Sequence, residues 1–146
     1  METTPVHIRP GRDGDASELA RLCRELGYPS TEAQVRERLV RLNGAEHGLF
    51  VAEDAGGGLR GVVDVHVRLV LEEDPFAELI ALVVNEDGRG EGVGSELVAE
   101  AVRWARTRRL PKLWVRVSLW REVTPRFYER LGFRKLKQQH VYELTL

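Results

Sequence analysis

Glycines occupy the alternate positions 90, 92 and 94, between an apolar segment and a segment with helical spacing. Because glycine has no Cβ, the backbone here can adopt positive φ and approach a ligand closely. N–H groups at a helix start attract anions, helped by the helix dipole, and Arg89 adds a forked donor suited to phosphate. The segment is therefore predicted to bind a phosphate or diphosphate, with a purely structural strand-to-helix turn as the alternative.

The spacing excludes two familiar phosphate-binding loops. A Walker A loop requires Gly-Lys followed by Ser or Thr, but Gly94 is followed by Ser95 and Glu96. A dinucleotide fingerprint starting at Gly90 requires a further glycine at 95, and it usually occurs in the first βα unit of a chain. The spacing of this turn therefore does not favour a nucleotide-binding domain.

Regular elements flank the turn on both sides. Residues 78–84 form an almost continuous apolar run, as expected of a central strand covered on both faces. The segment after the turn carries apolar residues at helical spacing, beginning at Val93 and ending at Ala105. The predicted anion site therefore lies between a buried strand and a long amphipathic helix.

The rest of the chain supplies the elements that must position this turn. We expect strands at 6–8, 48–53, 60–70 and 113–117, one or two final strands over 133–144, and helices at 15–26, 31–42 and 124–131. Asp15 with Glu18, and Thr31 with Gln34, are expected helix caps. Residues 56–58 are expected to turn a hairpin whose second strand has a buried valine face and a wet face carrying Asp64, His66 and Arg68. The order β-α-α-β-β-β-α-β-α-β predicts an α/β or α+β mixed sheet with helices on both faces.

The composition bounds the class of protein. The chain has 146 residues, 42% of them hydrophobic, and a net charge of −1, which predicts one ordered domain over residues 1–146. This charge balance argues against a strongly basic nucleic-acid-binding face. The single Cys23 excludes an intramolecular disulfide and a multi-cysteine zinc site. Without an apolar leader or a membrane-length apolar run, we expect a cytoplasmic protein with no metal, membrane or nucleic-acid partner.

The chain resembles the GNAT superfamily of acyl-CoA-dependent N-acyltransferases in two motifs. The family pattern Arg/Gln-x-x-Gly-x-Gly/Ala is met by residues 89–94, and its phenylalanine-tyrosine…glycine-phenylalanine segment is met by residues 127–133. The two motifs occur in the expected order, separated by one helix and one strand. The expected element order also suits this fold, so the resemblance covers essentially the whole chain.

The resemblance implies an acetyl-CoA-dependent N-acetyltransferase whose cofactor enters a gap between the strands that start near 78 and 112. Backbone N–H groups of the turn would hold the coenzyme A diphosphate, and strand residues would run along the pantetheine arm. Main-chain groups of Leu82 and Val84 would bond the amides of that arm. The implied cofactor-binding residues are Leu82, Val83, Val84, Arg89, Gly90, Glu91, Gly92, Val93, Gly94 and Ser95.

The family mechanism, direct attack of an amine on the thioester in a ternary complex, requires an oxyanion donor, an acid and a base. A backbone N–H near Leu82 and Val83 is the expected oxyanion donor. Tyr128 is the expected acid for the thiolate, because a tyrosine hydroxyl with an ordinary pKa of about 10 stays protonated at neutral pH. A packing role on an apolar helix face is the alternative for Tyr128.

Glu78 stands eleven residues before Arg89, a spacing at which some family members carry a general-base glutamate. The alternative is an ordinary strand-end carboxylate facing solvent. Histidines are also capable of accepting the proton, but no spacing distinguishes one of them, and surface or strand-face positions are expected for His7, His47, His66 and His140.

Two positions depart from the family pattern. Many relatives carry an asparagine seven residues before the tyrosine and an alanine three residues after that asparagine, whereas this chain has Arg121 and Thr124. The asparagine contact with the pantetheine must therefore be replaced or absent. This departure leaves room for an alternative function, a non-catalytic acyl-CoA-binding sensor or accessory domain.

The acceptor is expected to be an amine on a small molecule or a protein, and the chain is expected to be capable of forming a homodimer. In this fold the first two helices and the segment before the central strand shape the acceptor pocket, here residues 16–42 and 71–76. The acidic residues 72–74 could attract a cationic amine, or they could be a solvated loop. The sequence does not rank the amines.

Overall fold

A computed structural model describes residues 5–42, 44–85, 92–118 and 123–146 of the chain. It divides into two compact units, residues 1–116 and 117–146. The first unit contains β1 (Val6–Pro10), a 3₁₀ turn (Asp13–Asp15), α1 (Ala16–Leu26), α2 (Glu32–Arg41), β2 (His47–Asp54), β3 (Leu59–Arg68), β4 (Phe76–Val84), α3 (Val93–Thr107) and β5 (Leu113–Val115). The second contains α4 (Val123–Arg130). The expectation of a single domain stays a prediction.

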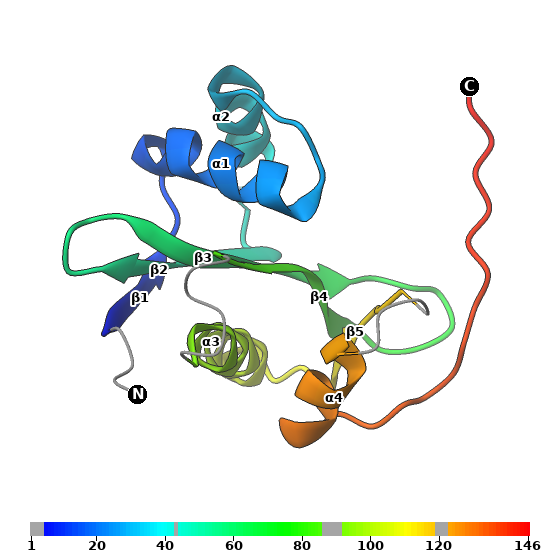
Figure 1. Cartoon of the computed structure of the whole chain (residues 1–146). Coiled ribbons are helices and arrows are strands. Elements are labelled where there is room, and N and C mark those ends of the chain that lie inside the picture. The colour runs from blue at the N-terminus through cyan, green and yellow to red at the C-terminus, as the bar shows by residue number, and fades with distance from the viewer. Residues whose placement is uncertain (1–4, 43, 86–91, 119–122) are drawn as a thin grey trace. The chain divides into compact units, whose positions relative to one another are not determined.

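The first unit is a sheet with helices on both faces. The described strands form one five-stranded sheet in the order β1-β2-β3-β4-β5, antiparallel except for the parallel β4–β5 pair. Helices α1 and α2 cover one face and α3 covers the other (Figure 1). The predicted fold class, a mixed α/β or α+β sheet with helices on both faces, is confirmed.

Apolar side chains fill both layers. On the α1–α2 face the core includes Leu19, Leu22 and Val35 of the helices and Val62 and Val83 of the sheet. On the other face, α3 buries one side of its length, from Val93 through Leu97 and Ala101 to Ala105. Burial of these side chains is the main favourable contribution to stability, at about 1.5–3 kcal/mol for each fully buried large one.

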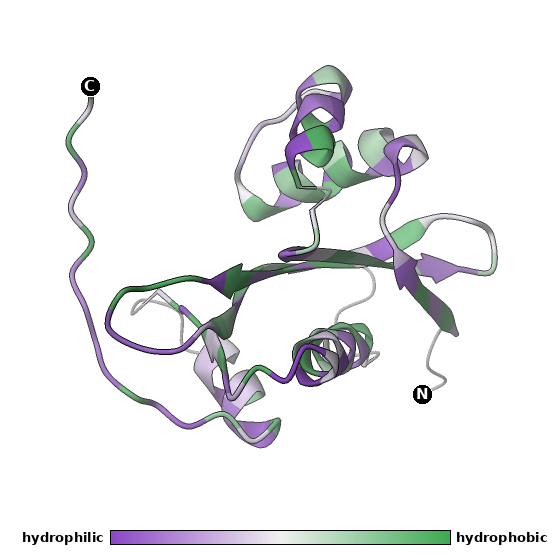
Figure 2. Cartoon of the chain, turned by 180° about the vertical axis from the view of Figure 1, so that it is seen from behind, coloured by the Kyte–Doolittle hydropathy of each residue, from purple (hydrophilic) through white to green (hydrophobic). Residues whose placement is uncertain are grey.

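The predicted strand at 133–144 is wrong. No described residue after α4 belongs to a strand, and apolar residues such as Val141 and Leu144 are largely exposed. Figure 2 shows polar and apolar residues interspersed along this segment. A strand, however, is defined by its ladder with a neighbour, and a pattern within one segment cannot supply that partner.

The local signals for α2 and for the β2–β3 hairpin are confirmed. Thr31 Oγ1 accepts a hydrogen bond from the Gln34 N–H at 3.1 Å, and Gln34 Oε1 accepts one from the Thr31 N–H at 3.0 Å. This reciprocal pair is the predicted capping box. In the hairpin, Gly57 has φ +87°, and the Asp54 carboxylate accepts the N–H groups of Gly56 and Gly58.

Asp15 has a different role from the predicted cap of α1. Its side chain makes no bond to the helix N-terminus. Instead it accepts the Arg12 N–H at 2.9 Å and is bound in a fork by Arg9 at 2.8 and 2.9 Å. The chain thus uses this buried carboxylate to fasten the 3₁₀ turn to β1, because an arginine fork suits a carboxylate better than a single helix N–H does.

We expect Asp15→Asn to destabilise the protein at pH 7 by about 1.5–3 kcal/mol, the usual value of a hydrogen bond to a charged group. Burial alone would raise the pKa of Asp15, but the bonds from Arg9 and Arg12 lower it overall. A carboxyl with a lowered pKa stabilises the fold above its unfolded pKa of about 3.9 and loses that contribution as the pH falls further. Urea unfolding at pH 7 and pH 3 should therefore show a wild-type advantage that shrinks in acid. The exposed Asp13→Asn is the matched control, and an equal gap at both pH values would contradict the assignment.

Candidate functional site

β4 and β5 separate after a short shared segment. Their parallel pairing joins residues 77–79 of β4 to residues 113–115 of β5, whereas β4 continues to Val84. Among the described residues, 80–84 of β4 have no β5 partner, although 81–84 pair with β3 on the other edge. The strand therefore presents an open edge whose N–H and C=O groups can bond an extended ligand.

A bulge at Ile80 decides which residues face that open edge. Leu79 pairs with Val65 and Ala81 with Asp64, so Ile80 is an extra residue without a β3 partner. Ahead of the bulge, the Ala77 N–H points toward β5 and donates to Lys112 O at 3.0 Å.

Beyond the bulge the alternation is reversed. The Asn85 N–H points toward β3 and donates to Arg60 O at 2.8 Å. Since residues two apart address the same edge, Val83 also faces β3, and Leu82 and Val84 face the open edge. These are the two residues whose main-chain groups were predicted to bond a pantetheine arm.

The start of α3 forms the other part of the predicted cradle, of which Arg89, Gly90 and Glu91 lie outside the described residues. Gly92 has φ +83° and caps the helix in the left-handed conformation. Val93 is buried, and Gly94 and Ser95 are half-buried. In any helix the first N–H groups lack intrahelical acceptors, so this end of α3 is suited to an anion.

Gly61 of β3 lets α3 lie close to the sheet. A Cβ at Gly61 would be 2.8 Å from Val83 O and 2.9 Å from Leu97 Cδ1, and 3.4 Å from Val93 Cγ1. The absent side chain thus brings the first turn of α3 beside the open part of β4. The two described parts of the predicted cofactor site converge at this point.

We expect Gly92→Ala to destabilise the protein by about 1–2 kcal/mol, the usual cost of a left-handed conformation for a residue with a Cβ. Among the described residues, no atom outside its chain neighbours lies within 4 Å of the added Cβ, so backbone strain is the expected cause. Chemical unfolding would measure the loss. In the same described part of the chain, the Cβ of Gly14→Ala also meets no atom within 4 Å, and Gly14 has no left-handed φ, so this variant should stay within about 0.5 kcal/mol of the wild type, and equal losses at both sites would contradict this reasoning.

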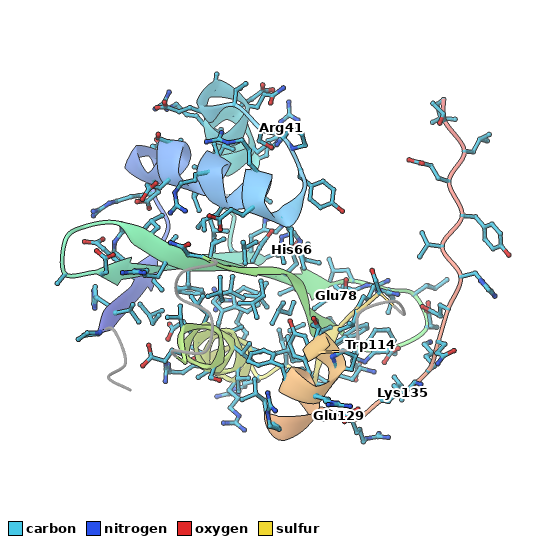
Figure 3. The ribbon with its side chains drawn as sticks, viewed as in Figure 1. Arg41, His66, Glu78, Trp114, Glu129 and Lys135 are labelled. Carbon is cyan, nitrogen blue, oxygen red and sulfur yellow. The ribbon has the colours of Figure 1, made fainter. Side chains whose placement is uncertain are left out.

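Glu78 is a buried, ion-paired carboxylate. Its side chain is 10% exposed, and Oε1 accepts Arg68 Nη1 at 2.9 Å and Arg116 Nε at 3.2 Å. The alternative of a solvent-facing strand-end carboxylate is therefore wrong. Figure 3 shows Glu78 near the β5 end of the sheet, in the region of Trp114, which is its cross-strand partner.

Tyr128 belongs to the second unit. It is 6% exposed in α4, and its ring makes edge contacts with Phe127 at 5.0 Å and Phe133 at 5.4 Å between centroids. Gly132 has φ +98° and follows the helix, as predicted. The packing role of the ring is thus present, and the role of the hydroxyl as an acid stays a prediction.

The positions on β3 that were expected to face solvent, Asp64, His66 and Arg68, are half-buried. The side chains of Asp64 and His66 are 16% and 22% exposed, and His47 of β2 is the cross-strand partner of His66. Burial raises the pKa of the Asp64 carboxyl, with the imidazoles of His66 and His47 acting in the opposite direction. Sequence reasoning missed this cluster because it depends on strand register, which no spacing within one segment reveals.

Other candidates are less informative. Glu73 of the acidic run forms an ion pair with Lys112, so part of its charge is compensated. Arg121 lies outside the described residues, and Thr124 is half-buried in α4. In the part of the chain that the structure describes, no three metal-ligating side chains group together, and no helix is long and apolar enough to cross a bilayer.

The family model described as acetyltransferase (GNAT) family matches residues 15–133. The chain belongs to this family. A curated relative, an uncharacterized N-acetyltransferase from Methanocaldococcus jannaschii, is 36% identical over 93 residues, which are 62% of this chain and 40% of the relative. The GNAT chain thus matches less than half the length of that protein. A mycothiol acetyltransferase from Acidothermus cellulolyticus is 36% identical over 61 residues, which are 42% of this chain and 19% of that relative.

Solved structures confirm the GNAT fold. Glucosamine-6-phosphate N-acetyltransferase from Arabidopsis thaliana has a TM-score of 0.85 at 17% identity, covering 97% of this chain and 99% of that one. An aminoglycoside N-acetyltransferase, AAC(6′)-Iy, in complex with CoA has a TM-score of 0.86 at 17% identity, covering 98% and 97%. At these identities the likeness concerns the fold alone.

Proposed function

We propose that this GNAT chain transfers an acetyl group from acetyl-CoA to a primary amine. The observation that carries the proposal is the open edge of β4 beside the left-handed glycine that starts α3. An extended amide-containing arm with a diphosphate at one end fits this pair of features, because the edge offers main-chain partners and the helix start attracts the anion.

Two groups of main-chain donors and acceptors would bind acetyl-CoA. Gly92, Val93, Gly94 and Ser95, with Arg89, Gly90 and Glu91 of the same turn, would hold the diphosphate through backbone N–H groups. The main chain of Leu82 and Val84 would bond the arm, with Val83 between them. Acetyl-CoA supplies an activated thioester, and a backbone N–H near Leu82 and Val83 would donate to its carbonyl oxygen.

Two side chains would manage the protons. Tyr128 would protonate the departing thiolate, and Glu78 would accept the proton of the amine, directly or through water. The ion pairs of Glu78 with Arg68 and Arg116 hold one carboxylate oxygen, Oε1, in a fixed position, and the proton would be accepted by the other, Oε2. The acceptor itself is proposed only as an amine.

Thermal unfolding with acetyl-CoA, CoA, NAD and ATP tests the binding part of the proposal. A ligand at 100 times its dissociation constant stabilises by about 2.7 kcal/mol, so CoA and acetyl-CoA should raise the melting temperature and NAD and ATP should not. A thiol-release assay across an amine panel then tests transfer. Stabilisation by CoA without thiol release would instead assign an acyl-CoA-binding sensor, and no stabilisation by CoA would overturn the proposal.

A further inference from the structure

Three half-buried polar side chains on β2 and β3, Asp64, His66 and His47, form a cluster that the proposed mechanism does not use. Asp64 Oδ1 lies 2.8 Å from His66 Nε2, and the rings of His66 and His47 meet edge to face at 4.3 Å between centroids. Among the described residues, Asp64 Oδ1, His66 Nε2 and His47 Nδ1 are buried without a well-aligned hydrogen-bond partner. Buried polar groups are usually satisfied, so such a group calls for an explanation.

The close approach of Asp64 and His66 indicates that the pair holds a proton. A carboxylate oxygen and an unprotonated imidazole nitrogen are both acceptors, and two buried acceptors at 2.8 Å repel each other unless a proton lies between them. The raised pKa of the Asp64 carboxyl agrees with this. The cluster is therefore able to gain and lose a proton inside the sheet layer.

The cluster is next to the proposed base. Val62 packs in the α1–α2 core, and residues two apart on a strand share a face, so Asp64 and His66 lie on that face too. His66 pairs across the strands with Glu78 on one side and with His47 on the other. Cross-strand partners have Cβ atoms about 4.5–5.5 Å apart, so Glu78, His66 and His47 form a row across β4, β3 and β2. Figure 3 shows the first two on their neighbouring strands.

The charged groups nearest this row are on the strands. Asp64 and Arg68 come from β3, His47 from β2, Glu78 from β4, and Arg116 follows β5. The helices pack apolar core residues on this face, and Glu18 and Arg21 of α1 bond the main chain of Leu59 on β3. Arg12 and Asp13 line the surface near His47. At the far end of the row, His47 lines a cavity of about 370 Å³ together with Leu49, Trp104 and Arg108, which offers the proton an exit to water.

We propose that His66 is a proton-relay residue that takes from Glu78 the proton lost by the acceptor amine and passes it toward Asp64 and His47. This inference rests on the proposed function. In the overall step the new N–C bond forms, the C–S bond breaks, and the thiolate receives the proton of Tyr128. The amine proton travels by Glu78 and His66 to solvent, and solvent returns one proton to Tyr128, so atoms and charge balance.

The test compares His66→Gln with His7→Gln, the same change at an exposed histidine of β1. Glutamine retains hydrogen-bonding groups but cannot carry a proton near neutral pH. We expect His66→Gln to lower kcat about 10- to 100-fold, with KM for acetyl-CoA unchanged. The limb of the kcat/KM profile between pH 5 and 8, the range in which imidazole ordinarily titrates, should be lost. His7→Gln should keep the wild-type rate and profile.

Asp64→Asn, which preserves shape, provides a second variant, and the imidazole NMR chemical shifts provide a readout besides activity. Replacing His66, or Asp64 which contacts it, should change the imidazole shifts of His47, because the rings of His66 and His47 meet edge to face, and should leave those of His7 as they were. Wild-type turnover, pH profile and His47 shifts in both variants would overturn the relay alone. Failure of the wild type to bind CoA or release thiol would overturn the proposed function, and the relay with it.

Discussion

Replacing Tyr128 by phenylalanine should lower kcat by about 100- to 10,000-fold, the range that a positioned general acid contributes. The substitution removes the hydroxyl that would protonate the thiolate. It keeps the ring, which contacts Phe127 and Phe133. KM for acetyl-CoA should hardly change, since the proposed cradle consists of residues of β4 and the start of α3.

The measurement is thiol release at saturating acetyl-CoA, accompanied by thermal unfolding of the variant. The free energy of unfolding should fall by no more than about 1.5 kcal/mol, the usual value of one hydrogen bond. Tyr142→Phe is the matched control, because Tyr142 is 89% exposed. A Tyr128→Phe enzyme with wild-type kcat would restrict Tyr128 to packing.

Phe76→Ala should lower the free energy of unfolding by about 3–5 kcal/mol, the usual cost of truncating a buried phenylalanine. Phe76 is 1% exposed. Its ring lies 4.8 Å from that of Trp114 and beneath the cationic groups of Lys112 and Arg68, at 4.6 and 5.6 Å from its centroid. The loss is a large share of the roughly 5–15 kcal/mol of a typical domain.

The urea midpoint at constant slope measures this loss. Leu71→Ala is the control, because Leu71 lies in the preceding loop and is fully exposed, and it should stay within about 0.5 kcal/mol of the wild type. Since Phe76 begins β4 where β4 and β5 approach each other, the variant should also bind CoA more weakly. A loss below about 1 kcal/mol would show that this core region relaxes around the cavity.

Signals confined to one segment predicted structure well. The capping box of Thr31 and Gln34, the glycines of the β2–β3 hairpin and the apolar run of β4 each act over a few residues. The start of α3 after Gly92 is also as expected, whereas the anion-binding role of the glycine turn stays a prediction. The motifs that resemble the GNAT family could therefore be recognised in the sequence. The fold class followed from the order of the expected helices and strands.

Features that depend on distant partners could not be predicted. Asp15 is bonded by Arg9 of β1 instead of capping its own helix, and the burial of Glu78 reflects Arg68 and Arg116 on other elements. His66 meets His47 only through the β2–β3 register. The strand predicted after α4 was wrong for the same reason, because a strand requires a neighbouring strand with which to pair.

The extra residue at Ile80 makes β4 two half-strands of opposite phase. In the first half, the odd-numbered residues such as Ala77 direct their amides toward β5. In the second half, Leu82 and Val84 direct their amides toward the open edge, while the side chain of Val83 stays in the core. Shortening the strand by that single residue would leave an equally apolar sequence, yet it would exchange the inward and outward amides. The number of residues in this strand therefore matters more for the open edge than the identity of each side chain. We expect homologous chains to vary these side chains while keeping the length of the strand.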